Sequence, residues 1–300
     1  MVIRLDDDTL DSFLPLIPEE IQDYAEEDNV YCFGSVRDET AVGVLVFSLG
    51  DGVSRDGDPK VMVMLYWICT AEDYRRQGVA DELMKALLDV TGDSGETVIV
   101  CSIPLNEDPG EATAFFRNRG FEFDANDIPI MEISKEDCRQ SVKGTNKEKE
   151  LIIAAEPERP EGLVSLNDIS RVRFRKTVKS MLDNEDFSYY YNLTDAIDVY
   201  DRDTSYAIMK GSEISSIVLF RKTRRDELHM VMLDARINAD PRELLELLHY
   251  AAARYYLDKP EEMRVRLILW KEKSRKLAEH IFPHKNVFMV RRGFLSVSPR

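Results

Sequence analysis

Hydrophobic and polar positions in the first half of the chain follow a regular succession of strand and helix patterns. Alternating or uninterrupted apolar residues indicate strands, and apolar residues three or four apart indicate helices. Strands are predicted at residues 2–5, 30–36, 40–49, 61–69 and 97–103, and helices at 9–24, 78–90 and 110–118. Two further short strands, at 121–123 and 128–133, are expected to close the series as a hairpin.

The second half repeats the same order of patterns. Strands are predicted at 151–155, 197–200, 205–210, 214–221, 229–234, 264–270 and 287–297, and helices at 169–182, 241–256 and 274–281. Residues 134–149 are polar and lack periodicity, which is typical of a linker. We therefore predict an α/β (α+β) chain in which one fold occurs twice, at 1–133 and at 150–300, with a linker at 134–149.

Bulk properties are those of a globular protein that stays in the cytoplasm. The 300 residues suffice for two domains, and 44% of them are hydrophobic. No apolar run reaches the roughly 18–20 residues that cross a bilayer, and the acidic start lacks the basic and apolar parts of a signal peptide. The four cysteines are widely spaced and are expected to be reduced thiols in a cytoplasmic protein.

Charge is unevenly distributed between the two halves. Residues 1–140 contain 11 Lys and Arg against 31 Asp and Glu, whereas residues 141–300 contain 29 against 25. Such an acidic half would repel phosphates, so nucleic acid is not an expected partner. An acidic surface favours solubility, and it would also attract a cationic partner.

The connection between the strand at 61–69 and the next helix carries a candidate anion site. Its residues are Arg75-Arg76-Gln77-Gly78-Val79-Ala80. A helix N-terminus presents unpaired N–H groups and a positive dipole end. Gly78 permits close approach of the backbone to a ligand, and the two arginines add positive charge in an acidic half. The alternative is an ordinary strand-to-helix turn with a permissive glycine.

This run resembles the pyrophosphate loop of the GNAT acyltransferase superfamily, [Arg/Gln]-x-x-Gly-x-[Gly/Ala], with Arg75, Gly78 and Ala80 at the defined positions. The later run GEATAFFRNRGF resembles the second motif of the family, with Ala112 four residues before Phe116. The resemblance implies two GNAT-like domains, each a mixed, mostly antiparallel sheet flanked by helices. It covers residues 1–135 by motif and residues 150–300 by element order alone.

The resemblance also implies a co-substrate, acetyl-CoA or another acyl-CoA, and a set of residues that bind it. Backbone groups at the end of the fourth strand would pair with the pantetheine arm where the fourth and fifth strands separate after Thr70. Amides of the loop and Asp81 would enclose the pyrophosphate, and the helix at 110–118 would flank the thioester. The implied binding residues are Ile68, Cys69, Thr70, Arg75, Arg76, Gln77, Gly78, Val79, Ala80, Asp81 and Phe116.

Three departures from the family pattern concern catalysis. Phe116 stands where relatives often have a proton-donating Tyr, Met64 stands near the place of a basic Glu, and Pro109 replaces an Asn. Glu72 and Tyr66 are candidate replacements, although a surface acid and a core aromatic are the simpler interpretations.

A covalent route through a cysteine is the less favoured chemistry. Cys69 would lie beside the thioester, but the first 228 residues contain no His that could activate it. We therefore expect an N-acyltransferase in which an amine attacks the thioester directly. The alternatives are a non-catalytic acyl-CoA sensor and a scaffold.

The acceptor is expected to be a small or peptidyl amine, and the chain a monomer or a homodimer. No metal is expected, because Pro283 separates His280 from His284 and no third ligand suggests itself. The second half lacks the glycine loop and has Asp240-Pro241 there, an acidic cap that would repel a pyrophosphate. It is predicted to be a degenerate GNAT-like domain that does not bind coenzyme A.

Overall fold

Contacts in the computed structural model divide the chain into two units, Met1–Asn126 with Arg291–Arg300, and Asp127–Val290. The described residues are 1–25, 29–53, 59–92, 95–105, 109–140, 142–143, 150–151, 157–182, 197, 200–224, 227–236, 239–269 and 271–298. Units defined by contacts need not coincide with ancestral domains. The predicted domain bounds at 133 and 150 therefore stay a prediction.

The first unit is built on a sheet of order β1-β2-β3-β4-β5-β15, with β6 paired to β15. Strands β1 to β4 pair antiparallel, and β4 and β5 pair parallel. The bounds are β1 Val2–Arg4, β2 Val30–Arg37, β3 Thr40–Val53, β4 Pro59–Thr70, β5 Thr97–Pro104, β6 Glu122–Phe123 and β15 Phe288–Val297. The part of β15 from Arg291 onward belongs to this unit.

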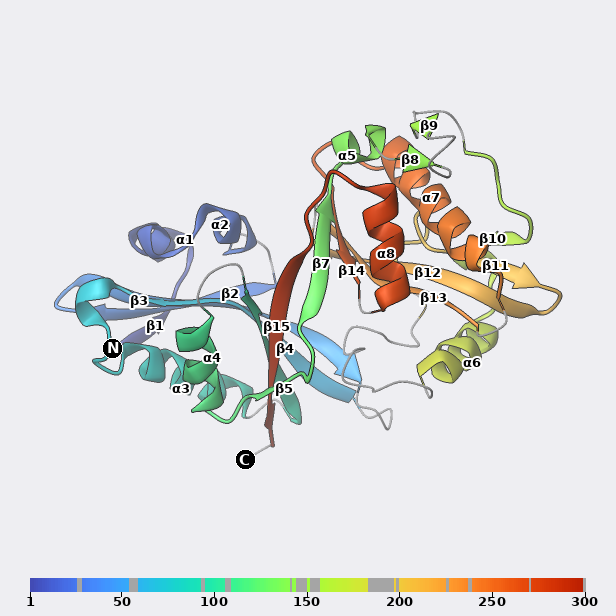
Figure 1. Cartoon of the computed structure of the whole chain (residues 1–300). Helices are drawn as coiled ribbons and strands as arrows, with labels where there is room; N and C mark the ends of the chain where they lie inside the picture. Colours follow the sequence, from blue (N-terminus) through green and yellow to red (C-terminus); the bar gives the residue numbers. More distant parts are fainter. Residues whose placement is uncertain are drawn as a thin grey trace. The chain divides into compact units, whose positions relative to one another are not determined.

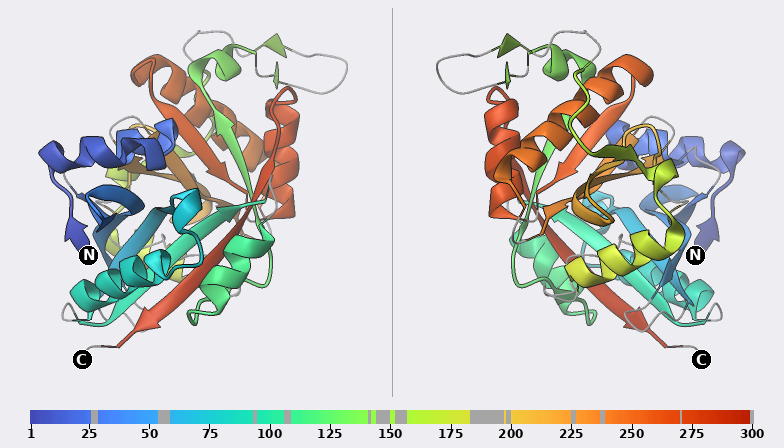
Figure 2. Two further views of the ribbon diagram at one scale, coloured as in Figure 1. Left: turned by 90° about the vertical axis from the view of Figure 1, so that its left-hand side faces the viewer. Right: turned by 90° about the vertical axis from the view of Figure 1, so that its right-hand side faces the viewer.

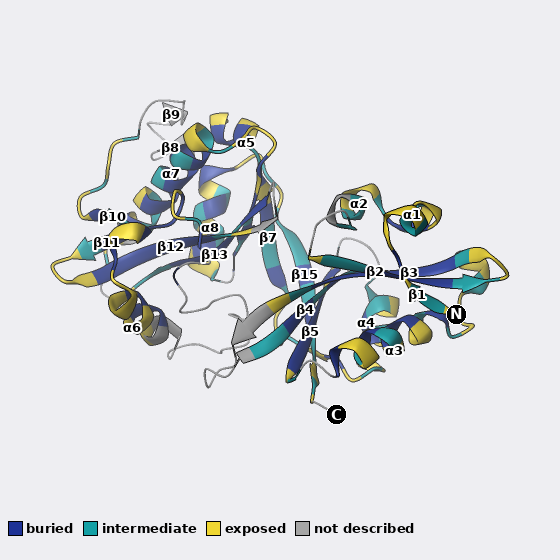
Figure 3. Ribbon diagram, turned by 180° about the vertical axis from the view of Figure 1, so that it is seen from behind, coloured by how far each residue is buried: buried dark blue, intermediate teal, exposed yellow. Residues whose placement is uncertain are grey.

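Helices cover both faces of this sheet (Figures 1 and 2). One face carries α1 (Asp7–Leu10), η1 (Asp11–Leu16) and α2 (Glu19–Ala25), and the other carries α3 (Val79–Thr91) and α4 (Gly110–Arg117). The residues that point inward are aliphatic and aromatic, and the outward faces of the helices are exposed (Figure 3). Burial of these apolar side chains holds the layers together.

The second unit has a sheet of order β15-β7-β14-β13-β12-β11-β10, in which β13 and β14 pair parallel. Its strands are β7 Ile128–Ile133, β10 Leu163–Ser165, β11 Tyr206–Lys210, β12 Glu213–Arg224, β13 Glu227–Ala235 and β14 Arg264–Ile268. Its helices are α5 Lys135–Arg139, η3 Leu166–Asp168, α6 Arg171–Leu182, α7 Pro241–Asp258 and α8 Glu272–Ile281, and a separate ribbon joins β8 Val142–Lys143 to β9 Glu150–Leu151. The predicted strands at 151–155 and 197–200 lie largely outside the described residues.

The two units repeat one irregularity in their sheets. Each has a bulge in the strand that precedes its long helix, where the extra residue is Tyr66 in β4 and Val231 in β13. In each unit the last residue paired with the parallel neighbour lies immediately before that bulge, Leu65 in β4 and Met230 in β13. A bulge ends regular pairing and bends the strand. The shared position confirms that one mixed α/β fold occurs twice.

The predicted closing hairpin of the first half was wrong. β6 pairs with β15, and β7 pairs with β14 and with the first residues of β15. Both strands therefore find partners far away in sequence rather than each other. Local pattern could not show this, because the apolar continuity of residues 128–133 suits any buried neighbour.

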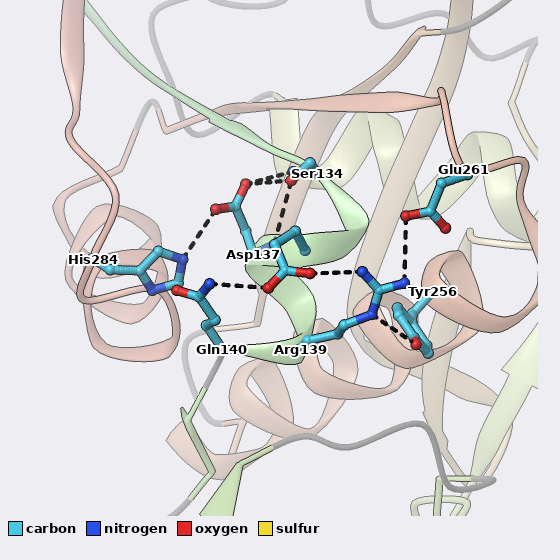
Figure 4. Close-up of polar contacts among 8 residues, drawn as sticks. Ser134, Asp137, Arg139, Gln140, Tyr256, Glu261 and His284 are labelled. Carbon is cyan, nitrogen blue, oxygen red and sulfur yellow. Dashed lines mark hydrogen bonds and ion pairs between the residues drawn. The ribbon is translucent and has the colours of Figure 1, made fainter.

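Part of the predicted linker is the helix α5, which begins with a capping box. The Ser134 hydroxyl accepts from the Asp137 N–H, and the Asp137 carboxylate accepts from the Ser134 N–H at 2.7 Å. The other carboxylate oxygen lies 3.1 Å from His284 Nε2 (Figure 4). Arg139, at the end of the helix, donates to the Tyr256 hydroxyl at 3.0 Å. Five residues are too few to show helical periodicity, so the sequence pattern indicated no structure here.

Replacing Asp137 by Asn is expected to lower the unfolding free energy by about 2 kcal/mol at neutral pH. Burial raises the pKa of Asp137, but hydrogen bonds from Ser134 and Lys285 together lower it by more. The pKa of this carboxyl is therefore below its usual value. The stability from this carboxylate is thus present above the unfolded pKa of about 4 and is lost as the pH falls through the folded pKa. Chemical denaturation between pH 7 and pH 3 measures this. A difference that persists undiminished at pH 3 would contradict the assignment.

Candidate functional site

In the first unit, β4 extends beyond its pairing with β5. Leu65 and Cys101 form the last parallel pair, whereas residues 67–70 are paired with β3 alone in the part of the sheet that the structure describes. A strand with a neighbour on one side leaves alternate N–H and C=O groups open on the other. The separation was predicted after Thr70. It begins earlier because the bulge at Tyr66 ends the parallel ladder.

The connection from β4 to α3 has an unusual backbone. It consists of Ala71, η2 (Glu72–Tyr74) and residues 75–78, of which Arg76 has φ of 61° and Gly78 has φ of 82°. Gln77, between them, has no positive φ. Backbone that alternates in this way can direct successive N–H groups to one side and form a concave anion site. Gly78 is also the N-cap of α3, and no described side chain caps the helix there.

One hydrogen bond orients the peptide at the centre of this loop. Arg37, the last residue of β2, donates from Nη2 to the carbonyl oxygen of Gln77 at 3.2 Å. The C=O and N–H of a trans peptide point in opposite directions. The N–H of Gly78 is therefore directed away from Arg37. The first N–H groups of α3, which follow it, have no intrahelical acceptor.

The first turn of α3 contains two acids, and each is paired with an arginine from another element. Glu82 lies 2.9 Å from Arg37, and Asp81 forms an ion pair with Arg119, which follows α4. Sequence reasoning singled out neither arginine, because each is about 40 residues from its partner acid. The carboxylate of Asp81, which is predicted to help enclose a pyrophosphate, pairs with Arg119.

The loop leaves room for a ligand at Gly78. A Cβ built on this residue would meet no atom within 4 Å. The opposite holds at Gly43 in β3, where a Cβ would lie 2.5 Å from Val79 Cγ1 and 3.1 Å from the carbonyl oxygen of Cys69. Gly43 thus lets the start of α3 approach the end of β4. The free edge of β4, at residues 67–70, and the loop at residues 75–78, called the anion loop below, are thereby brought side by side. This arrangement fits a nucleotide thioester with an extended arm.

All but one of the implied binding residues fall into two groups. Ile68, Cys69 and Thr70 lie on the open part of β4, and residues 75–81 form the loop and the first turn of α3. Phe116 is different, because it is 6% exposed and packs between Phe115 and Phe121 with ring centroids 5.1 and 5.0 Å away. A side chain with so little exposed area offers a ligand almost no surface. Whether any of these residues binds acyl-CoA stays a prediction.

The candidate catalytic residues have separate surroundings. The Tyr66 hydroxyl lies 3.0 Å from Ser48 Oγ, and the ring packs on the face covered by η1 and α2. Glu72 is an exposed side chain in η2. Met64, at the position where relatives often have an acid, packs in a small apolar cluster with Val98. A catalytic role for Tyr66 or Glu72 stays a prediction.

Cys69 is a poor nucleophile by its surroundings. Burial raises the pKa of its thiol, and the positive charge of Arg75 offsets this only in part. A thiol with a raised pKa is protonated at neutral pH, and the thiolate is the nucleophilic form.

In the second unit, side chains of the protein contact the corresponding part of β13. Beyond the last pair of β13 with β14, the carbonyl of Leu233 accepts a hydrogen bond from Ser274 Oγ at 3.1 Å, and Lys271 Nζ lies 2.6 Å from Asp234. The following helix, α7, has Asp240 as N-cap in a capping box with Glu243. The predicted N-cap is thus confirmed. Two carboxylates occupy the helix end that an anion would need.

The structure also bears on metals and membranes. Among the described residues, no three His, Cys, Asp or Glu side chains are grouped so as to hold a metal ion. Within the same part of the chain, none of the helices combines the length and the apolar character that membrane spanning requires.

Comparisons with known proteins agree with this architecture. Residues 3–121 match the model of the Acetyltransferase (GNAT) family. A tandem GNAT protein from the clavulanic acid biosynthesis pathway is 14% identical with a TM-score of 0.54, over 100% of this chain and 99% of that one. A GCN5-related N-acetyltransferase from Sphaerobacter thermophilus is 14% identical with a TM-score of 0.51, over 94% and 85%.

A third similar structure is part of a larger protein. It is a fungal multi-domain GH3 β-N-acetylglucosaminidase with a GCN5-related glucosamine N-acetyltransferase region, 13% identical with a TM-score of 0.58. The match covers 98% of this chain and 38% of that protein. A search of curated proteins found no match. Identities this low show the fold alone, whereas the family match rests on sequence. Residues 3–121 therefore belong to the GNAT acetyltransferase family, and the chain has the fold of a tandem GNAT protein.

Proposed function

We propose that this chain is an acyl-CoA-dependent N-acyltransferase that moves an acetyl group from acetyl-CoA to a primary amine. The observation that carries the proposal is the loop from Arg76 to the first turn of α3, which opens beside the free edge of β4. Its N–H groups suit a diphosphate, and the free strand edge suits the amides of a pantetheine arm. The membership of residues 3–121 in the GNAT family supports the same reaction type.

The residues of the chain would contribute mainly binding and orientation. The amine nitrogen would attack the thioester carbonyl carbon, the carbon–sulfur bond would break, and a proton would pass from nitrogen to sulfur. A backbone N–H on the open edge of β4 would polarise the carbonyl. Tyr66, at the bulge, and Glu72, just beyond the strand, are the candidate groups for exchanging protons.

Thiol release in the presence of different amines tests this function. The purified chain is incubated with acetyl-CoA and with a polyamine, free lysine, a lysine peptide or an aminosugar. The acidic balance of the first 140 residues favours a cationic acceptor, so we expect the polyamine or a lysine amine to accelerate release above hydrolysis. Binding of acetyl-CoA without amine-dependent release would instead indicate a sensor, which the absence of an acid at Met64 and of a hydroxyl at Phe116 would then explain.

Replacing Cys69 by Ala separates direct transfer from a covalent route. Because burial keeps the thiol protonated, we expect kcat with the best amine to change by less than about threefold. Loss of a covalent nucleophile would lower kcat by several orders of magnitude. Steady-state kinetics, together with mass spectrometry of the protein after acetyl-CoA alone, measure both. A stable acetyl adduct on Cys69 would contradict direct transfer.

The second half is proposed to bind no coenzyme A and to serve the first in another way. What supports this is the hydrogen bond from Ser274 to the Leu233 carbonyl on the open edge of β13, the ion pair of Lys271 with Asp234, and the acidic cap of α7. The expected stoichiometry is one acetyl-CoA per chain.

A further inference from the structure

The first turn of α3 carries charge of the wrong sign for an anion site. Asp81 and Glu82 occupy its third and fourth positions, and the acid side chains are exposed, at 65% and 43%. Acids in the first turn stabilise the free helix, but they would repel a diphosphate bound at the same N–H groups. The site therefore requires that both negative charges be offset.

Both offsetting charges come from outside the helix and are held in place. Arg119 lies over the ring of Phe115 at 3.5 Å and donates to the Phe115 carbonyl oxygen at 2.6 Å, while its other end pairs with Asp81. Arg37 ends β2 and bonds both Glu82 and the Gln77 carbonyl. Neither guanidinium has to be ordered when a ligand arrives, because protein contacts already fix it.

We propose that Arg37 and Arg119 are positioning residues for coenzyme A. Arg119 cancels the charge of Asp81, and Arg37 cancels that of Glu82 while it turns the Gly78 N–H toward the ligand. The inference rests on the proposed function, because it assigns a role toward the diphosphate of the same site. It concerns binding, so it predicts a change in coenzyme A affinity and in KM with little change in kcat.

Charge rescue is the decisive experiment, and Arg119 offers the cleaner double-mutant cycle because its guanidinium bonds Asp81 and the Phe115 carbonyl rather than the loop backbone. Arg119→Ala leaves Asp81 uncompensated and is expected to weaken coenzyme A binding about tenfold at low salt. Adding Asp81→Asn to that variant removes the exposed charge. The double variant should bind within about twofold of the unchanged protein. For Arg37→Ala, Glu82→Gln should rescue only in part, because the bond to Gln77 is still lost.

Matched controls separate this role from a structural one. Arg117→Ala removes a cation from the same helix end, where the side chain lies over the ring of Phe123, and should leave affinity unchanged. Pantetheine, which lacks the diphosphate, should bind equally to all variants. The loss in Arg119→Ala should also shrink as salt is raised from about 0.02 to 0.5 M.

The outcomes are distinguishable by isothermal titration calorimetry with coenzyme A. If the unchanged protein does not bind coenzyme A, the proposed function and this inference fall together. If it binds but Arg119→Ala and Arg37→Ala bind equally well, only the inference is overturned. It is also overturned if Arg119→Ala with Asp81→Asn stays as weak as Arg119→Ala alone, because the arginine would then contact the ligand itself or support the fold.

Discussion

Replacing Gly78 by Ala is expected to weaken coenzyme A binding by about 30-fold or more. At φ of 82° an alanine is strained by roughly 1 kcal/mol, so the loop tends to leave the conformation that gathers its N–H groups. The added Cβ would enter space that no protein atom occupies within 4 Å, and a diphosphate held close to the backbone needs such space. Affinity is measured by calorimetry, and the unfolding free energy by chemical denaturation.

Gly95→Ala is the matched control for this variant. Gly95 belongs to the same unit, has φ of 94°, and its added Cβ would likewise meet nothing within 4 Å. Its replacement should cost similar stability and leave affinity unchanged. Equal affinity in both variants would contradict the assignment of the loop as the diphosphate site.

Replacing Gly43 by Ala is expected to lower the unfolding free energy by about 2–3 kcal/mol and to weaken coenzyme A binding about tenfold. The new Cβ would lie 2.5 Å from Val79 Cγ1 and 3.3 Å from Leu83 Cδ1, so α3 has to shift away from β3. Because Val79 is the first residue of that helix, the shift would move the N–H groups of the anion loop. Thermal or chemical unfolding and a coenzyme A titration measure the two effects.

Two further variants test the physical cause of the Gly43 effect. Gly50→Ala lies in the same strand, and its Cβ would meet nothing within 4 Å, so the unfolding free energy should change by less than about 0.5 kcal/mol. Val79→Ala removes the methyl group that the new Cβ would strike. The combination Gly43→Ala with Val79→Ala should therefore cost less than the sum of the single changes. Simple additivity would show that the contact is not the cause.

Local pattern predicted most of the elements and the position of the loop that precedes α3. Alternation and helical spacing placed the helices and strands within a few residues, and the run Arg75–Ala80 placed the loop at the start of α3. The Asp240 N-cap in the second half was predicted by residue type alone and is confirmed. These features are local, so the residues that cause them are neighbours in sequence.

The features that sequence reasoning missed depend on distant partners. Arg37 and Arg119 lie far along the chain from the acids they neutralise, and nothing near either residue indicates the pairing. The strand β7 was assigned a neighbour in sequence, whereas its partners are β14 and β15. Helix α5 is stabilised by a capping box and by His284, which is 147 residues from Asp137. Pairings of this kind require the fold.

A crystal structure of the full chain with acetyl-CoA tests the central claim most directly. We expect one acetyl-CoA per chain, with diphosphate oxygens within hydrogen-bond distance of the backbone N–H groups of Gly78 and of the first turn of α3. The pantetheine arm should lie along residues 67–70 of β4. A diphosphate bound elsewhere, at α7 of the second unit for example, would contradict the account, as would density for the nucleotide with the loop empty.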